Sequence, residues 1–301
     1  MTGPRPKAAI HVDLDGVTEV YGTHGWGWSR ADDPVFESGM QALLDYLDEE
    51  NVRATLFVIG TSVGNPRKRG LLEEAVRRGH ELASHTMRHR NLLGLSREEK
   101  RRELEESRAV IAAELGVEVH GFRAPGYQVD RETVELLDEL GYRYDSSAFP
   151  TATFAQRLGT GENRLETPGR PYDGLALCEL PLPDHRPSPV PINPSYAHLL
   201  GVPYFRWGMR RMARSQRPTV LLFHLIDLAA PLARADLRGV RSRIFTLSTL
   251  SQERKLSRCR MMMRSLREVF EVVTTGRLLE EVPHEPVAGS QRPGAGGEKT
   301  A

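Results

Sequence analysis

Short apolar segments alternate with amphipathic segments along the first half of this chain, and that alternation limits the folds it can adopt. The apolar segments are hydrophobic nearly throughout, without the every-second-residue polar pattern of a sheet that has one wet face. Strands of this kind are buried on both faces, so the pattern predicts an α/β fold with a parallel sheet and helices outside it. The expected strands are 7–16, 52–60, 80–85, 117–127 and 142–147, and the expected helices between them are 33–51, 68–79, 96–116 and 130–141.

The alternation breaks between residues 149 and 203, where proline and glycine are dense and only 174–182 has the pattern of a strand. After the break, the pattern predicts a helix, a buried strand, a closing helix and a short last element, at 203–217, 218–227, 247–270 and 271–282 respectively.

The length and the tail of the chain indicate one folded unit. A chain of 301 residues lies within the usual range of a single α/β barrel. We therefore expect one domain over residues 1–282, with its core motifs in 7–228 and a helical C-terminal part in 229–282. Residues 283–301 are rich in glycine and proline, so we expect a disordered tail there.

The bulk composition excludes several classes of function. The formal net charge is +1, so no global field favours nucleic acid or an anionic membrane. No apolar run approaches the roughly 18 residues of a transmembrane helix. The first residues lead straight into a strand, without room for the apolar stretch of a signal peptide, and the two cysteines show no metal-ligand spacing. We therefore expect a cytoplasmic protein.

Three polar side chains share one face of the first expected strand. Side chains alternate along a strand, so His11, Asp13 and Asp15 point one way, while Val12 and Leu14 point the other. Two buried carboxylates without partners would cost several kcal/mol or force one of them to take up a proton. A bound cation would remove that cost for one aspartate and leave the other free to act as a base. For either aspartate taken alone, a structural turn or cap is the alternative.

A histidine pair could supply the other ligands of such a cation. His85 and His89 are four residues apart directly after the strand 80–85, and on one helical turn their side chains would face the same way. One aspartate and two histidines, with open positions for water, suit zinc or a similar divalent ion. An isolated pair at this spacing is more often a chance surface feature, and it is the strand-end position together with Asp15 that favours a site.

Three further strand ends carry polar residues. Arg123 could hold a carboxylate ionised, or it could form a salt bridge at the barrel rim. His224 ends an apolar strand and could be either a functional imidazole or a core histidine. Asp145 could accept a hydrogen bond from a histidine and set its tautomer, or it could cap the turn with the two serines that follow it.

Five short segments follow one another along the chain: HVDLDG, SHTMRH, GFRAPGY, YDSS and LLFH. In this order they resemble the NodB-homology polysaccharide deacetylases, carbohydrate esterase family 4, over roughly residues 7–228. The aspartates of the first segment flank one leucine, which is similar to the D-x-D subgroup of that family. The resemblance implies a distorted (β/α)7 barrel, so we expect residues 1–282 to form one NodB-like catalytic domain.

The resemblance also implies a metal site with a base beside it. Asp15, His85 and His89 match the metal-binding triad of the family, and one divalent metal ion, above all zinc, is the expected cofactor. Asp13 matches the catalytic base, which takes a proton from the attacking water.

Further roles follow from the same resemblance. Arg123 matches the residue that orients the base, and His224 matches the general acid that protonates the leaving amine. Asp145 is matched to the partner of that histidine. The backbone N–H group near Gly126, with Tyr127 beside it, would help to bind the substrate and stabilise the oxyanion.

Aromatic residues follow the first strand. Trp26 and Trp28 could form a rim on which a sugar stacks, and a loop that packs its own aromatic rings is an equal alternative.

The expected function is that of a metal-dependent polysaccharide or N-acetyl-sugar deacetylase, which hydrolyses an N-acetyl amide to a free amine and acetate. The expected partner is an N-acylated sugar or glycan intermediate, with no nucleic acid and with peripheral contact to a lipid-linked substrate left open. Two alternatives remain. One is a deformylase of a lipid-linked formamido sugar, or another linear or cyclic amide hydrolase, on the same fold. The other is an inactive glycan-binding barrel.

Overall fold

The computed structural model of this protein describes residues 4–188 and 190–282. The tail expected at 283–301 lies outside these residues. Among the described helices, none combines the length and the apolar character needed to cross a membrane.

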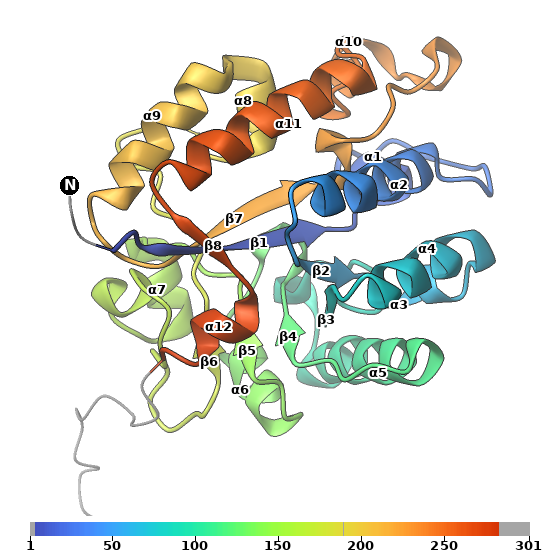
Figure 1. The fold of residues 1–301 in the computed structure, drawn as a ribbon. Helices are drawn as coiled ribbons and strands as arrows, with labels where there is room; N and C mark the ends of the chain where they lie inside the picture. The colour runs from blue at the N-terminus through green and yellow to red at the C-terminus, as the bar shows by residue number, and fades with distance from the viewer. Residues whose placement is uncertain (1–3, 189, 283–301) are drawn as a thin grey trace, which may run out of the picture.

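Eight parallel strands form one sheet, in the order β6–β5–β4–β3–β2–β1–β7, with β8 paired to the start of β1. The sheet curls, and the described edge strands β6 and β7 do not pair, so the barrel stays open on that side (Figure 1). The prediction of a distorted (β/α)7 barrel is confirmed. The strands are β1 (Lys7–Asp13), β2 (Thr55–Val58), β3 (Glu81–Ser84), β4 (Gly121–Phe122), β5 (Tyr144–Asp145), β6 (Cys178–Glu179), β7 (Thr219–His224) and β8 (Glu271–Val273).

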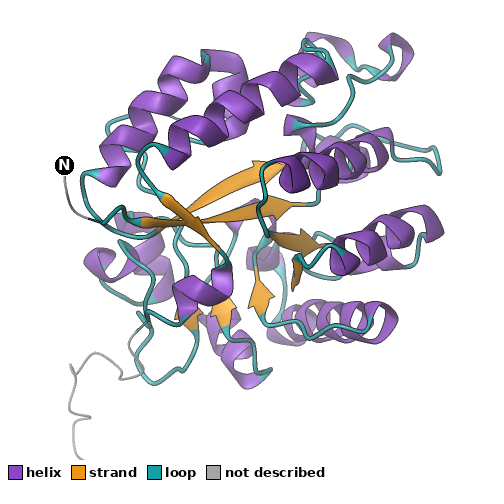
Figure 2. Ribbon diagram, viewed as in Figure 1, coloured by secondary structure: helices purple, strands orange, loops and turns teal. Residues whose placement is uncertain are grey.

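Helices flank the curled sheet (Figure 2). The helices are α1 (Val17–Thr23), α2 (Pro34–Glu49), α3 (Gly60–Val63), α4 (Pro66–Arg77), α5 (Arg97–Leu115), α6 (Arg131–Glu139), α7 (Ala152–Leu158), α8 (Pro194–Leu200), α9 (Val202–Ala213), α10 (Gly239–Phe245), α11 (Gln252–Arg267) and α12 (Thr275–Leu279). Short 3₁₀ turns lie at η1 (Leu92–Gly94), η2 (Pro125–Tyr127), η3 (Glu162–Leu165), η4 (Leu225–Asp227) and η5 (Arg234–Asp236).

The long helices agree with their sequence patterns, and the short ones were missed. Ser96 caps α5 as a capping box, with its side chain accepting from the Glu99 amide and the Glu99 carboxylate accepting from the Ser96 amide. Helices α1, α8 and α10 were not expected. Each has only 7 residues, about two turns, which is too short for a periodic pattern to stand out.

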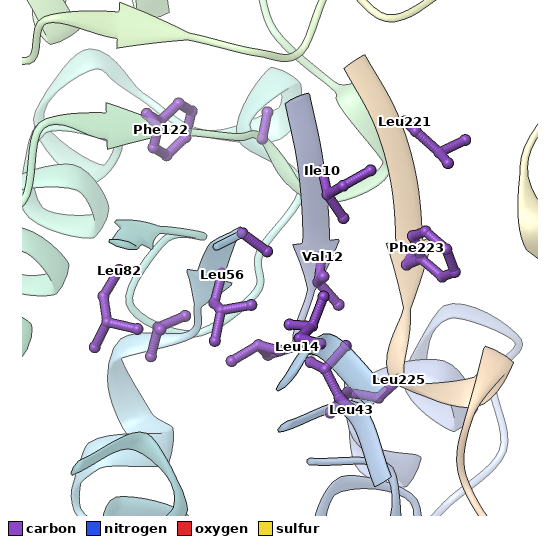
Figure 3. Packing of buried hydrophobic residues seen from close by; sticks show 14 of the residues in the cluster. Ile10, Val12, Leu14, Leu43, Leu56, Leu82, Phe122, Leu221, Phe223 and Leu225 are labelled. Carbon is purple, nitrogen blue, oxygen red and sulfur yellow. The ribbon is translucent and has the colours of Figure 1, made fainter. Parts of the chain in front are cut away.

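The core has two layers because both faces of the sheet are covered. Ile10, Val12 and Leu14 point outward along β1 and its end, where they pack with Leu43 of α2 and Leu56 of β2 (Figure 3). Burial of one such side chain contributes about 2 kcal/mol to folding.

The alternate residues of the same strands fill the barrel interior. Phe57, Ala83, Tyr144 and Leu222 form a second buried cluster there. The polar residues of the site lie on this inner side, at the carboxyl ends of the strands, where barrels of this kind place their active sites.

Candidate active site

The first strand places an acid beside the histidine that ends the seventh. β1 and β7 pair in a register that sets Asp13 opposite His224. Asp13 is only 2% exposed, and its Oδ2 lies 3.8 Å from His224 Nε2. Asp15 follows two residues after the end of β1, and it lies at the edge of the sheet where both strands end.

Asp15, His85 and His89 converge at this edge. Asp15 Oδ1 lies 3.5 Å from His85 Nε2 and 3.2 Å from His89 Nε2. One ligand atom from each residue lies within 4.8 Å of the others, and within residues 4–188 and 190–282 this is the one such group of three or more His, Cys, Asp or Glu. The predicted triad therefore has the geometry of a metal site.

The histidines do not lie on a helical turn, and that part of the prediction is wrong. They lie on an irregular loop after β3, in which Thr86 and His89 have φ angles of 64° and 53°. Residues other than glycine adopt this conformation only where surrounding contacts hold them. The Gly60 and Thr61 amides at the start of α3 donate to the Thr86 and Met87 carbonyls, 3.0 Å each, and these bonds hold the loop.

His85 is oriented for metal binding by its second nitrogen. Nδ1 lies 2.8 Å from the Arg123 carbonyl, which only accepts, so Nδ1 carries the proton. The Nε2 atom of His85 faces the Asp15 carboxylate, 3.5 Å from Oδ1. Asp15 Oδ1 and His89 Nε2 are buried and have no hydrogen-bond partner in the described part of the chain. A divalent cation among these atoms would satisfy all of them, so the donor set fits a metal ion such as zinc.

The charges of this group act on one another. Burial raises the pKa of Asp15, but the charge of His89 and the contacts with both imidazoles outweigh burial and hold that pKa well below its usual value. Burial lowers the pKa of His89, and the Asp15 charge reverses this, so the pKa of His89 is raised. Asp15 is thus an ionised ligand at neutral pH.

Arg123 fixes Asp13 and is itself fixed on every side. This residue is fully buried, and its Nη1 donates to Asp13 Oδ1 at 2.8 Å. Its Nε and Nη2 donate to the Ser146 carbonyl and hydroxyl, each at 2.7 Å, and its Cζ lies 4.1 Å from the centre of the Phe57 ring. The geometry agrees with the predicted orienting role more closely than with a salt bridge at the rim.

His11 also supports Arg123. Its Nδ1 lies 2.9 Å from Arg123 Nη2, a donor, so Nδ1 accepts, and Nε2 donates to Thr275 Oγ1 at 3.0 Å. Burial and the Arg123 charge lower the pKa of His11 well below its usual value, so the ring is neutral. The short helix α12 therefore contributes to the support of Arg123 from the far end of the barrel.

His224 has different partners from those expected. Its Nδ1 lies 3.3 Å from Ser195 Oγ, and Ser195 donates to Asp227 Oδ1 at 2.7 Å. The His224 amide donates to Asp227 Oδ2 at 2.8 Å, and the Tyr127 hydroxyl lies 3.4 Å from Nε2. Ser195 and Asp227 were missed in the sequence. Asp227 lies three residues after His224 and could have been considered, whereas Ser195 lies in the irregular stretch and carried no signal.

The prediction that Asp145 pairs with His224 is wrong. Asp145 Oδ1 accepts from the Ser146 amide at 2.8 Å and from the Ser147 hydroxyl at 2.6 Å. Asp145 lies opposite Glu179 in the pairing of β5 with β6. Burial, together with the Glu179 charge, raises the pKa of Asp145 well above its usual value. Asp145 is therefore a buried structural carboxyl group, closer to the turn-capping alternative.

The turn after β4 leaves one backbone amide available. The Ala124 amide donates to Ser147 Oγ at 2.8 Å, and the Tyr127 amide donates to the Ala124 carbonyl at 2.9 Å. Gly126, with φ 55°, lies between them, and no acceptor for its amide occurs in the described residues. The amide of Gly126, rather than that of Tyr127, is thus the candidate for oxyanion binding.

The two tryptophans pack within their own loop. The rings of Trp26 and Trp28 make edge contacts with Tyr21 at 5.5 and 5.8 Å between centroids. The ring that stacks on Trp26, His24, lines a cavity beside His224, but neither tryptophan does. The structure therefore agrees with the alternative of a loop that packs its own aromatic rings.

One protein family matches this chain. The profile described as Polysaccharide deacetylase matches residues 25–144. Residues 25–144 are thus similar to the polysaccharide deacetylase family. The chain is 33% identical to chitin deacetylase 1 of Cryptococcus neoformans var. grubii over 116 residues, which are 38% of this chain and 24% of that protein. The chain spans less than half the length of the curated relatives it matches.

Solved structures share the fold of this chain. A candidate polysaccharide deacetylase of Mycobacterium smegmatis superposes with a TM-score of 0.62 at 20% identity, covering 97% of both chains. A family 4 acetyl xylan esterase of Clostridium thermocellum, in complex with a cobalt ion, has a TM-score of 0.51 at 16% identity and covers 93% of this chain and 94% of its own. At these identities the likeness establishes the barrel fold.

Proposed function

We propose that this protein hydrolyses the acyl amide of an N-acylated amino sugar with the help of one divalent metal ion, zinc being the expected one. The observation that carries the proposal is the meeting of Asp15, His85 and His89 beside Asp13 and His224, at one edge of the barrel. The match of residues 25–144 to the polysaccharide deacetylase family supports the substrate class. The cobalt ion in the related esterase supports the use of a metal.

Asp15, His85 and His89 would hold the ion, and the chemistry it supplies when bound is Lewis-acid activation of water and of the amide carbonyl. Asp13 accepts the proton of the attacking water, because Arg123 occupies only one of its two carboxylate oxygens. Since Arg123 is fixed by Ser146, the free oxygen of Asp13 keeps its direction toward the reacting water.

His224 delivers a proton to the amine nitrogen as the carbon–nitrogen bond breaks. Its Nε2 faces Asp13, and its Nδ1 is turned toward Ser195, so the ring is held at both nitrogens. The Gly126 amide would donate a hydrogen bond to the oxyanion and so stabilise its charge. Water and amide together give a carboxylate and a free ammonium group, with no change of oxidation state.

The test is an assay of carboxylate release from a panel of N-acylated sugars. Chelator-treated protein is compared with the same protein after addition of zinc. The proposal predicts release of a carboxylate and a free amine only after zinc is restored. Release of formate alone would identify a deformylase. Full zinc occupancy without release from any member of the panel would contradict the proposal in favour of a glycan-binding barrel.

A further inference from the structure

A large apolar cavity opens beside His224. It has a volume of about 410 Å³, and Tyr127 and His224 line its end next to Asp13. Most of its wall is aliphatic or aromatic and comes from β7, α8, α10 and the irregular stretch between β5 and α8. The wall residues that matter most here are Phe149, Leu182, Leu199, Leu222, Ile244 and Phe245.

The mouth of this cavity leaves large apolar side chains in water. Leu199 of α8 is 49% exposed, and Ile244 and Phe245 of α10 are 39% and 43% exposed. Contiguous apolar surface beside a reactive site is unfavourable unless a ligand covers it, and such surfaces are typical of binding sites.

Beside the metal site, the surface is more polar than in the apolar cavity. A second hollow is lined by His89 and Gly126 of the site, together with Glu19, Asn91 and Gln128. These side chains offer donors and acceptors to hydroxyl groups. Thr23 lines both hollows, and Gly126 of the second is followed by Tyr127 of the first, so the two hollows are neighbours.

The amide of an N-acylated sugar joins a polar sugar to an apolar acyl chain, and the two hollows differ in polarity in the same way. The sugar, rich in hydroxyl groups, fits the polar hollow beside His89, so the acyl group is left for the apolar cavity beside His224. An acetyl methyl group is about the size of one water molecule, roughly 30 Å³, and would leave most of that cavity empty.

We propose, resting on the amide hydrolase function above, that the acyl group this enzyme removes is longer than acetyl. The substrate class is an amino sugar that carries a medium-length alkanoyl chain on its nitrogen, with the chain in the apolar cavity. Hydrolysis adds water across the carbon–nitrogen bond and gives a fatty acid carboxylate and the free amino sugar.

A chain-length series tests the proposal. N-acetyl, N-butanoyl, N-hexanoyl and N-octanoyl glucosamine share one sugar and differ only in the acyl chain. We expect kcat/KM to rise about fourfold for each buried methylene until the cavity is full. Highest activity on the acetyl compound would overturn the proposal and leave the amide hydrolase function standing. The proposal would also be overturned if kcat/KM rose with an apolar group attached to the sugar and not with the length of the acyl chain.

Matched substitutions locate the chain. Leu199→Glu and Ile244→Glu place a carboxylate in the cavity wall at partly exposed positions, so the fold should survive. Their controls are Leu200→Glu on α8 and Val240→Glu on α10, which are 55% and 75% exposed and do not line the cavity. We expect the octanoyl-to-acetyl ratio of kcat/KM to fall at least about tenfold in the first pair and to stay unchanged in the controls. Equal ratios in all four variants would overturn the proposal.

A binding measurement without hydrolysis tests the acyl cavity independently of the proposed hydrolase function. Calorimetric titration of chelator-treated protein with N-octanoyl and N-acetyl glucosamine needs no metal and no hydrolysis. We expect tighter binding of the octanoyl compound, and loss of that preference in Leu199→Glu. If the preference is present and hydrolysis fails on every substrate, only the proposed function is wrong. If both sugars bind equally, the acyl cavity is wrong.

Discussion

At the scale of single residues, two aspartates two positions apart differ because their partners differ. Asp13 is bonded to Arg123, a fixed cation, whereas Asp15 faces two imidazoles. Asp13 has a permanent cation as its partner and is available for proton transfer, whereas Asp15 and the two imidazoles converge as a set of atoms that could hold a metal ion. The different roles that we propose for the two aspartates therefore follow from the side chains they contact and not from their burial.

Asp13→Asn separates these roles. The amide keeps the size of the carboxylate but cannot accept a proton, so we expect zinc affinity within about twofold of the wild type and a kcat lower by about 10²–10⁴. Zinc titration and initial rates on the same preparation measure both. If the variant lost zinc and kept its turnover, the assignments of base and ligand would be reversed.

Ser195→Ala tests the role of Ser195 as the partner of His224, a role predicted for Asp145 from the sequence. Loss of the Ser195 hydroxyl removes the contact with Nδ1 and leaves the backbone bond to Asp227 intact. We expect about a tenfold lower kcat, with KM and zinc affinity unchanged, because only proton delivery is affected. Ser215→Ala, an exposed helix-end serine, is the control. A kcat equal to that of the control would show that Ser195 does not position His224.

At the scale of elements, the site is built from loops that stiff elements hold in place. The metal-site histidines lie on a loop bonded to α3, and Arg123 lies at the start of the turn after β4. Helix α5 packs against α3 and β3, and its Glu103 carboxylate accepts from the Arg88 amide in the histidine loop. The Ser96 hydroxyl at the start of this helix bonds to Glu99, so loss of this cap should affect stability and leave metal binding unchanged.

Ser96→Ala tests this separation. Loss of the capping box leaves the Glu99 amide without its acceptor and should lower the free energy of unfolding by about 1 kcal/mol. Urea denaturation measures the loss, and we expect zinc affinity to stay the same. A change in zinc affinity without a change in stability would contradict the separation of the Ser96 cap from the site.

The carboxyl pair between β5 and β6 makes stability depend on pH. Burial raises the pKa of both Asp145 and Glu179, so the folded protein retains protons that the unfolded chain releases. The contribution of the pair to stability therefore falls as the pH rises above about 4, the ordinary carboxyl range. In Glu179→Gln we expect a smaller loss of stability between about pH 5 and pH 8 than in the wild type, measured by urea denaturation. An equal loss in both proteins would exclude the pair as its source.

At the scale of the whole molecule, the parts of the site that lie at strand ends could be predicted from the sequence. The carboxyl ends of parallel strands meet at one edge, so Asp13, Arg123 and His224 had to come close once the sheet was recognised. The convergence of His85 and His89 was expected for the wrong local reason, since two left-handed residues, and not a helical turn, bring them to Asp15.

The other parts of the site could not be predicted from the sequence, because they depend on contacts between segments that are distant along the chain. Glu179 meets Asp145 through a strand of two residues after a long irregular stretch, and Ser195 reaches His224 from a helix of two turns. Neither element has enough residues for a periodic pattern, so pairing and packing placed them. The same stretch supplies much of the apolar cavity, so the cavity could not be predicted from a periodic pattern.

The most direct test of the metal site is calorimetric titration of zinc into chelator-treated protein, for the wild type and for His89→Ala. His89 is chosen because its imidazole lies on the outer loop, where truncation should spare the core. The wild type should bind about one zinc ion per chain, and the variant should lose at least about tenfold in affinity. Equal affinity and stoichiometry in the two proteins would contradict the triad and, with it, the hydrolase.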